Sequence, residues 1–456
     1  MTSSLPPVAF DTSVAAVVVK LRLSVVHYGG LGVIRSLGRL GIPVYAVHEG
    51  RLAPPATSRY LSGGLVWQTT ADAADDPERL LDGLRTVAER IGGPAILVPT
   101  DDAAAIFMAE HRGRLEDRFR FPRPPAGLPR VLASKRGLYQ LCDQLRISCP
   151  KAALPSSRAE VEAFCANAAF PVVVKGAEPW LLPRGAGVRS TTIARSPEQL
   201  LELYRRVEDH PATGLLLQEY IPPDAGEDWF FHGYADQASA CLVGFTGRKL
   251  RSYPAHAGPT SLGRWAPNEE LRRQAEELFR TISYRGLMDL DYRLDRRDGR
   301  YKLLDFNPRL GAQFRLFEDD HGIDVVRAMH LDLTGRAVPR GRPLPGRGFI
   351  VENHDPIAAL QHRRAGGLTL RAWWSSVSGV REAAWFAADD PVPFLMMCLR
   401  FLRRRVRRVL AGAPRPAPAA GQRAIRPRYV RGRRQRRHRP GAAAAAAAPA
   451  RPIDEV

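Results

Sequence analysis

The sequence feature that most constrains the fold is a hairpin that carries several acidic side chains. Residues 287–294 and 301–306 alternate apolar and polar side chains, as strands with one buried face do. Between them, Asp298-Gly299 is a strong signal for a tight hairpin turn. The sequence therefore predicts an antiparallel hairpin with one apolar and one polar face.

The polar face of this hairpin gathers oxygen-bearing side chains. Asp289, Asp291 and Arg293 share one face of the first strand, and Asp305 and Asn307 share one face of the second. Asp and Asn are depleted in strands, and like charges that lie opposite one another destabilise a sheet. If the two polar faces coincide, two or three carboxylates and an amide converge, which suits Mg²⁺ completed by phosphates. The alternative is an ordinary solvated sheet face.

In this hairpin the chain resembles the ATP-grasp superfamily, specifically its carboxylate–amine ligases. In that family an acidic residue on one strand and a Glu-x-Asn-Pro-Arg-like element on the next hold two Mg²⁺ ions. Here Asp291 and the segment Asp305-Phe306-Asn307-Pro308-Arg309 match, with aspartates where the family has glutamates. The resemblance covers about residues 130–335. It implies bound ATP and Mg²⁺ or Mn²⁺, with Asp291, Asp305 and Asn307 as metal ligands.

Other spaced elements resemble the nucleotide-binding parts of the same family. Lysine is scarce among the 67 basic residues of the chain, yet three lysines occupy positions that contact phosphates in the family. The residues implied by the resemblance are Lys135, Lys175 and Lys249 at the phosphates, Gly185 and Gly187 in a loop that folds over them, and Gln218, Glu219, Tyr220 and Ile221 in the segment that binds adenine.

The activity implied by the resemblance is ATP-dependent ligation. A carboxylate would attack the γ-phosphate of ATP to give an acyl phosphate and ADP, and an amine or similar nucleophile would displace phosphate. Lys249 and Arg309 would be catalytic, with Arg309 stabilising the transferred phosphoryl group or the acyl-phosphate oxyanion. We also expect Asp305→Ala to abolish turnover of ATP while leaving the fold intact.

Two alternatives remain open. One is another ATP-grasp chemistry, either carboxylation or phosphorylation of a small metabolite. The other is a basic protein with a degenerate nucleotide fold that binds nucleic acid or a membrane surface. No aromatic residues interleave the basic cluster Arg431–Arg439, and no base-reading module is recognisable, so no specific nucleic-acid partner is expected.

Apolar periodicity predicts an α/β protein with α+β lobes. A strand at 14–26, a glycine-rich turn at 27–32, a helix at 33–40 and a strand at 44–47 open an N-terminal α/β domain. After residue 335 the pattern loosens. The predicted parts are an open α/β domain that precedes the ATP-grasp fold (1–130), the ATP-grasp small lobe (131–214), the large lobe with the Mg-ATP site (215–340), a C-terminal extension (341–410) and a disordered Arg/Pro/Ala-rich tail (411–456).

The basic charge is concentrated at the C-terminus. Of the net charge of +20, the region from Arg400 onward supplies +15, from 17 arginines and two acidic residues. Just before the tail, residues 394–410 predict an amphipathic helix with arginines largely opposite an apolar stripe. The stripe consists of Phe394, Leu395, Cys398, Leu402, Val406 and Val409.

This helix predicts either packing on the protein core or binding to an anionic membrane. The second interpretation predicts salt-sensitive binding to anionic liposomes that is lost on truncation at Pro391. No apolar run reaches the length of a membrane-spanning helix, and the five cysteines form no C-x-x-C pair. We therefore expect a cytoplasmic protein, with peripheral contact at the inner membrane face if the helix binds lipid.

Overall fold

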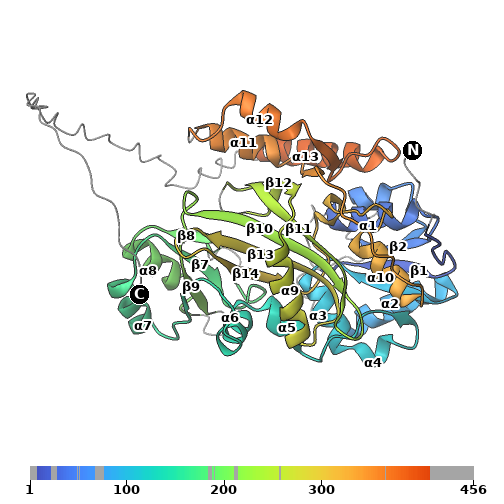
Figure 1. The fold of residues 1–456 in the computed structure, drawn as a ribbon, viewed down its shortest axis with the longest axis horizontal. Helices are drawn as coiled ribbons and strands as arrows, with labels where there is room; N and C mark the ends of the chain where they lie inside the picture. The colour runs from blue at the N-terminus through green and yellow to red at the C-terminus, as the bar shows by residue number, and fades with distance from the viewer. Residues whose placement is uncertain are drawn as a thin grey trace, which may run out of the picture. The chain divides into compact units, whose positions relative to one another are not determined.

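Three β-sheets organise the part of the chain that the structure describes. The computed structural model describes residues 8–21, 28–48, 50, 52–66, 76–182, 187–188, 191–209, 214–255, 258–364 and 366–410. Their order along the chain is a five-stranded sheet, a four-stranded sheet and a seven-stranded sheet (Figure 1). The predicted mixture of α/β and α+β architecture is confirmed, whereas the domain boundaries given above stay predictions.

The five-stranded sheet is parallel, with strand order β3-β2-β1-β4-β5. Its central strands are buried on both faces, which is why they read as nearly continuous apolar runs. Its strands are β1 (Ala15–Val19), β2 (Val44–His48), β3 (Gly63–Val66), β4 (Ala95–Pro99) and β5 (Phe119–Arg120); the helices of this region are α1 (Tyr28–Gly38), η1 (Pro54–Thr57), α2 (Pro77–Ile91), α3 (Asp102–Glu110) and α4 (Arg112–Leu115).

The turn predicted at 27–32 is wrong from Tyr28 onward, because helix α1 already begins there; His27 lies outside the described residues. The glycines that suggested a turn serve close packing instead. A Cβ atom on Gly32 would lie 2.8 Å from the Phe314 ring, and one on Gly38 would lie 2.7 Å from the Cβ of Tyr60. Glycine is therefore required here because α1 packs tightly against its neighbours, and the backbone remains helical.

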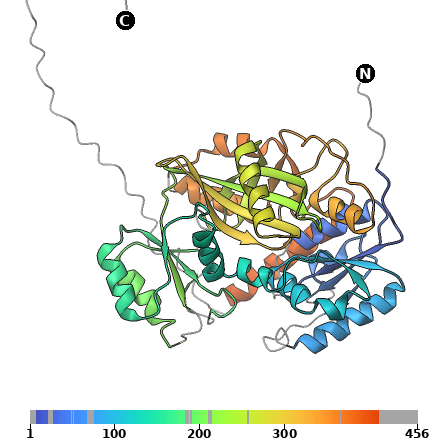
Figure 2. The same ribbon diagram turned by 60° about the horizontal axis from the view of Figure 1, so that its bottom comes forward.

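The four-stranded sheet is antiparallel and has its own core, which includes Val174, Leu200 and Leu217. Figure 2 shows this sheet with its two helices as a separate green layer. Its elements are β6 (Ala152–Ala153), α7 (Arg158–Asn167), β7 (Val172–Gly176), β8 (Thr192–Ala194), α8 (Pro197–Arg205) and β9 (Leu215–Glu219); α5 (Leu128–Ala133) and α6 (Lys135–Gln144) precede it.

The seven-stranded sheet has the order β14-β13-β10-β11-β12-β15-β16 and is antiparallel except for its last pair. One face packs on α9, and the other shares a core with α1 and α10. Its elements are β10 (Gly226–Ala235), β11 (Cys241–Ser252), β12 (Thr260–Trp265), α9 (Glu269–Thr281), β13 (Gly286–Asp295), β14 (Arg300–Asn307), η3 (Phe314–Leu316), α10 (Val325–Leu333), β15 (Gly348–Ile350) and β16 (Val380–Ala383).

Residues 336–364 and 366–410 include regular helices and strands, although their sequence pattern is loose; the tail predicted to be disordered, 411–456, lies outside the described residues. β15 and β16 extend the seven-stranded sheet, and three helices follow the sheet edge (Figure 1). Buried ion pairs tie this region to the body: Arg35 Nε lies 3.0 Å from Asp390, and Arg251 Nε lies 2.8 Å from Asp355. The three helices are α11 (Asp355–Arg364), α12 (Leu370–Val377) and α13 (Val392–Leu410).

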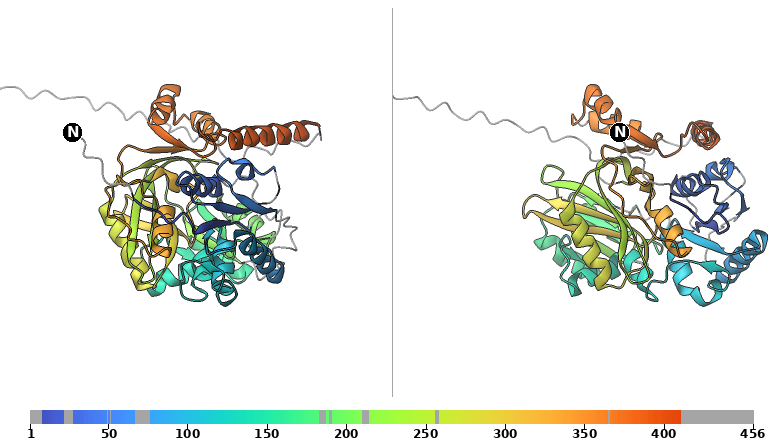
Figure 3. Two further views of the ribbon diagram at one scale, coloured as in Figure 1. Left: turned by 90° about the vertical axis from the view of Figure 1, so that its right-hand side faces the viewer. Right: turned by 45° about the vertical axis from the view of Figure 1, so that its right-hand side comes forward.

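The predicted apolar stripe of α13 is divided between two faces of the helix. Of the predicted stripe, Phe394 packs on the protein core together with Met397, which the prediction did not include, whereas the side chains of Leu395, Leu402 and Val406 are exposed. Figure 3 shows α13 as a long helix beside the region of the five-stranded sheet, and α13 contacts η1 of that region. No helix in the described ranges is long and apolar enough to cross a membrane.

Candidate active site

The strand pair β13/β14 brings the predicted carboxylates together. Asp291 lies directly opposite Asp305 and Asp289 opposite Asn307, and a bulge follows immediately after Asp291. Leu290, between the two aspartates, is fully buried on the opposite face of the strand. The alternation of faces predicted from the sequence is therefore confirmed.

Three lysines from separate elements converge on this carboxylate pair. Lys135, at the start of α6, places its Nζ 2.6 Å from Asp305 Oδ1, and Lys175 Nζ of β7 lies 3.2 Å from the same oxygen. Lys249 Nζ of β11 lies 3.0 Å from Asp291 Oδ1. All three lysines predicted to contact phosphates thus surround the predicted metal ligands.

The ionisation of the two aspartates differs. Burial alone would raise the pKa of Asp305, but the charges of Lys135 and Lys175 outweigh it and hold that pKa well below its usual range. Burial raises the pKa of Asp291, and the neighbouring carboxylates raise it further, whereas the charge of Lys249 lowers it by less. Burial lowers the pKa of Lys175, only partly offset by Asp305. Asp291 therefore lacks sufficient compensating positive charge, which an added cation would provide.

Asp289 is engaged by cationic and polar groups on both sides. Arg309 Nη1 donates to its Oδ2 at 2.6 Å, and His232 Nε2 lies 3.1 Å from its Oδ1, although without hydrogen-bond alignment. Asn307 Nδ2 donates to the Asp289 carbonyl at 3.1 Å. A Cβ on Gly311 would lie 2.1 Å from the His232 ring, so only glycine allows this packing. With both carboxylate oxygens in contact with side chains, Asp289 is better suited to hold Arg309 than to bind a metal.

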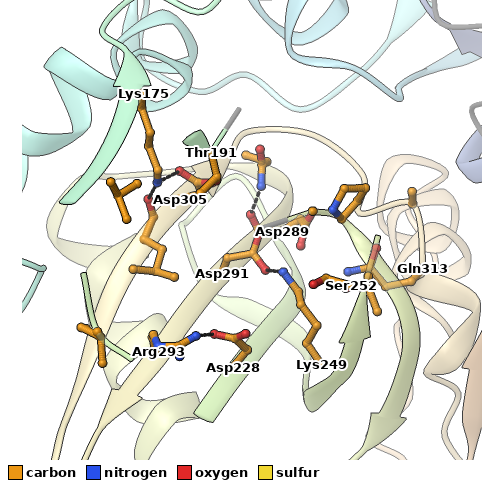
Figure 4. A pocket seen from close by; sticks show the side chains of 18 of the residues that line it. Lys175, Thr191, Asp228, Lys249, Ser252, Asp289, Asp291, Arg293, Asp305 and Gln313 are labelled. Carbon is orange, nitrogen blue, oxygen red and sulfur yellow. Dashed lines mark hydrogen bonds and ion pairs between the residues drawn. The ribbon is translucent and has the colours of Figure 1, made fainter. Parts of the chain in front are cut away.

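A cavity of about 530 Å³ lies over the hairpin and extends to both sides of it. Figure 4 shows Lys175 with Asp305, and Lys249 with Asp291, facing into it from different strands. The predicted site residues that line the cavity are Lys175, Gln218, Glu219, Tyr220, Ile221, Lys249, Asp291, Asp305, Asn307 and Arg309.

One end of the cavity is formed by the last residues of β9 and the two residues that follow it. Gln218, Glu219, Tyr220 and Ile221 lie there, and apolar walls come from β7, β8 and β14. The Glu219 carboxylate accepts a hydrogen bond from Lys302 Nζ at 3.0 Å. This slot, with apolar walls and a backbone edge, suits a flat heteroaromatic ring.

Two predicted residues do not line the cavity, and a third is outside the described residues. Lys135 is absent from the cavity wall but contacts Asp305 directly. Gly187 is exposed, with φ of +77°, and does not line the cavity. Gly185 lies outside the described residues. The loop prediction is therefore not tested by the described contacts.

The structure adds residues that sequence reasoning did not assign to the site, including Arg293, which was predicted only to share the polar face of the hairpin. Arg293 Nη1 donates to Asp228 at 2.5 Å in the cavity wall. The end of the cavity away from β9 takes side chains from distant parts of the chain, and no local motif marks them. They are Tyr28, Ser252, Thr260, Gln313 and His354.

The oxygen donors fit a magnesium ion that is shared with phosphates. Within the described part of the chain, no cluster of three or more His, Cys, Asp or Glu side chains could hold a metal by itself. Mg²⁺ typically takes only one or two carboxylates and completes its shell with water and phosphate oxygens. Asp291, Asp305 and the Asn307 side-chain oxygen provide such a partial set.

Comparison with known proteins supports the fold. No family model matches the sequence. The chain is 24% identical over 266 residues to the D-aspartate ligase of Enterococcus faecium, covering 55% of this chain and 62% of that protein. The chain thus spans less than two thirds of the length of this curated relative.

Solved structures resemble the chain over most of its length. The L-amino acid ligase of Bacillus licheniformis matches with a TM-score of 0.51 and 15% identity, over 74% of this chain and 76% of that one. The biotin carboxylase domain of the Hydrogenobacter thermophilus 2-oxoglutarate carboxylase, solved with MgADP, matches with a TM-score of 0.52 and 16% identity, over 72% and 71%. At these identities the likeness establishes the fold.

Proposed function

We propose that this chain, which has the ATP-grasp fold, is an ATP-dependent ligase that joins a carboxylate to an amine or similar nucleophile. It would activate the carboxylate as an acyl phosphate and release ADP and phosphate. The observation that carries the proposal is the opposed, half-buried pair Asp291 and Asp305 at the cavity wall, with three lysines paired to these two carboxylates. The names of the D-aspartate ligase and L-amino acid ligase relatives support the same reaction class.

The nucleotide would lie along the cavity from the β9 segment to the hairpin. Gln218, Glu219, Tyr220 and Ile221 would bind adenine, and the loop with Gly185 and Gly187 would cover the phosphates. Lys135 and Lys175, now paired with Asp305, would exchange that partner for phosphate oxygens. Pairing with a carboxylate before ATP binds keeps both lysines in place and avoids leaving buried charges unpaired.

Asp291, Asp305 and Asn307 would hold Mg²⁺, and the same oxygen set accepts Mn²⁺. When bound, the metal supplies positive charge that neutralises the phosphates during transfer. Lys249, fixed by Asp291, would face the transferred phosphoryl group. Arg309 is held against Asp289, with its Nε 3.4 Å from Asp102 of α3. From this position it would stabilise the transferred phosphoryl group or the acyl-phosphate oxyanion.

A hydroxylamine-trapping assay tests this proposal. Hydroxylamine converts an acyl phosphate into a hydroxamate, which is detected together with ADP release over a panel of D- and L-amino acids headed by aspartate. We expect hydroxamate only with ATP and Mg²⁺, and its loss on chelation. Bicarbonate-dependent turnover without hydroxamate would instead indicate carboxylation, and a stable phosphorylated metabolite would indicate a kinase; either result contradicts the ligase.

We also propose that α13 and its neighbours contact an anionic membrane from the cytoplasmic side. Exposed large apolar side chains concentrate in the C-terminal region: ten of the fifteen in the described residues lie between 360 and 406. On α13, Leu395, Leu399, Leu402 and Val406 follow helical spacing, and Trp374 of α12 is 68% exposed. Arginines on the same helix and in the sequence beyond it complement an anionic lipid surface. A basic helix with an apolar face binds such surfaces because burial of its apolar side chains and attraction of its positive charges to anionic lipids both favour binding.

Liposome sedimentation with a matched pair of variants tests the membrane contact. Leu402 and Leu52 are each 59% exposed, but only Leu402 lies on α13. We expect Leu402→Glu to weaken binding to phosphatidylserine-containing vesicles, and Leu52→Glu to bind like the wild type. Binding should fall with salt and be absent on neutral vesicles. Equal sedimentation of the two variants would contradict α13 as the contact.

A further inference from the structure

The end of the cavity beyond Lys249 is built from neutral polar side chains. Figure 4 shows Ser252 and Gln313 beyond Lys249, on the side of Asp291 away from Lys175. Ser252 pairs with Thr260 across β11 and β12, so both side chains are placed at one strand end. His354 completes this wall from the C-terminal region.

His354 is held in place by the residue that follows it. Asp355 is fully buried and accepts hydrogen bonds from Arg251, at 2.8 and 2.9 Å, and from Trp373 Nε1 at 3.0 Å. The His354 ring stacks on Tyr253, with ring centroids 5.0 Å apart. These contacts fix the imidazole at the start of α11.

Two polar atoms in this wall have no protein partner among the described residues. Thr260 Oγ1 and His354 Nδ1 are buried without a hydrogen bond, and Thr260 is only 3% exposed. A buried polar atom without a hydrogen bond destabilises the fold unless a ligand or water satisfies it. Burial also lowers the pKa of His354, so its imidazole is neutral near pH 7 and can accept a proton.

We propose that this end of the cavity binds the amine nucleophile, with Thr260 positioning it and His354 taking its proton. The role rests on the ligase function proposed above. The ring faces Tyr253, and Tyr28 and Lys249 line the same cavity as His354. The carboxylate next to His354, that of Asp355, is already engaged by Arg251 and Trp373, so it is not free to hold an ammonium group, which favours loss of the ammonium proton to His354.

The chemical step balances as follows. The ammonium group transfers one proton to His354, and its freed lone pair forms the C–N bond at the acyl phosphate carbon. The C–O bond to the phosphoryl group breaks with its electron pair, and phosphate leaves with the second proton of the nitrogen. His354 then releases its proton to solvent, giving an amide, hydrogen phosphate and one proton.

Comparison of two nucleophiles tests this role. Hydroxylamine is unprotonated at pH 7.5 and needs no base, whereas ammonium chloride and L-lysine supply protonated amines. We expect His354→Gln to lower amide formation with these amines about 100-fold, the effect of losing a general base. Its hydroxamate formation should stay within about twofold of wild type, which also demonstrates that the variant folds. His111→Gln, at the end of α3 and outside the cavity wall, is the matched control.

The outcomes separate this inference from the function on which it rests. The role of His354 would be overturned if His354→Gln lowered product formation equally with hydroxylamine and with amines, or if it did not lower amide formation with amines. Hydroxamate without any amide in the wild type would overturn the assignment of this end to an amine. Absence of hydroxamate from the wild type with every carboxylate would instead overturn the ligase itself.

Discussion

Replacing Asp305 by asparagine should destabilise the protein as well as stop catalysis. The carboxylate is the shared partner of Lys135 and Lys175, whose side chains are 13% and 6% exposed. Removing one partner of a buried ion pair costs about 3–5 kcal/mol. The Asp305 side chain is 26% exposed, so we expect the lower end of that range, about 3 kcal/mol. This revises the expectation from sequence that substitution of Asp305 would leave the fold unaffected.

Urea unfolding without nucleotide measures this cost, and the same hairpin offers a control. Asp298 contacts Lys302 at 3.2 Å but is 42% exposed, and Lys302 keeps Glu219 and Asp295 as partners. Asp298→Asn should therefore change the free energy of unfolding by less than about 1 kcal/mol. If Asp305→Asn lowered the free energy of unfolding no more than Asp298→Asn does, the reasoning that Asp305 compensates two buried lysines would be refuted.

Three further perturbations follow from the same contacts. Lys175→Met should weaken ATP binding about tenfold or more, because a charge-assisted bond contributes about 1.5–3 kcal/mol, and calorimetry showing unchanged affinity would count against it. Arg251→Met should lower the free energy of unfolding by about 3–5 kcal/mol because Asp355 loses its buried partner, whereas Arg381→Met, exposed on β16, should change it by about 0.5 kcal/mol or less. Asp305 has a depressed pKa, so its stabilisation is complete above the unfolded pKa of about 3.9 and is lost as pH falls towards the folded value. The stability gap between wild type and Asp305→Asn should therefore narrow below about pH 4, and a gap independent of pH would contradict the assignment.

The sequence determined the hairpin and the chemistry of its polar face. Alternation between faces is a local property of a strand, so placing Asp289 and Asp291 together required only their spacing. The resemblance to ATP-grasp enzymes then indicated lysines that lie far apart in the chain, and the structure brings Lys135, Lys175 and Lys249 to the same carboxylates. These pairs between distant residues could be predicted here because the resemblance to the family relates the positions of the lysines and the carboxylates.

Only the tertiary structure decided what surrounds that hairpin. The glycines of α1 suggested a turn because glycine allows more backbone conformations than other residues. The sequence alone does not show that the Phe314 ring packs against Gly32 and leaves no room for a side chain there. Asp289 contacts His232 because their strands pair. His354 lies at the cavity because the next residue, Asp355, forms a buried ion pair with Arg251, about 100 positions earlier in the chain. Such contacts leave no periodic signal, because they are selected by packing in three dimensions and not by spacing along the chain.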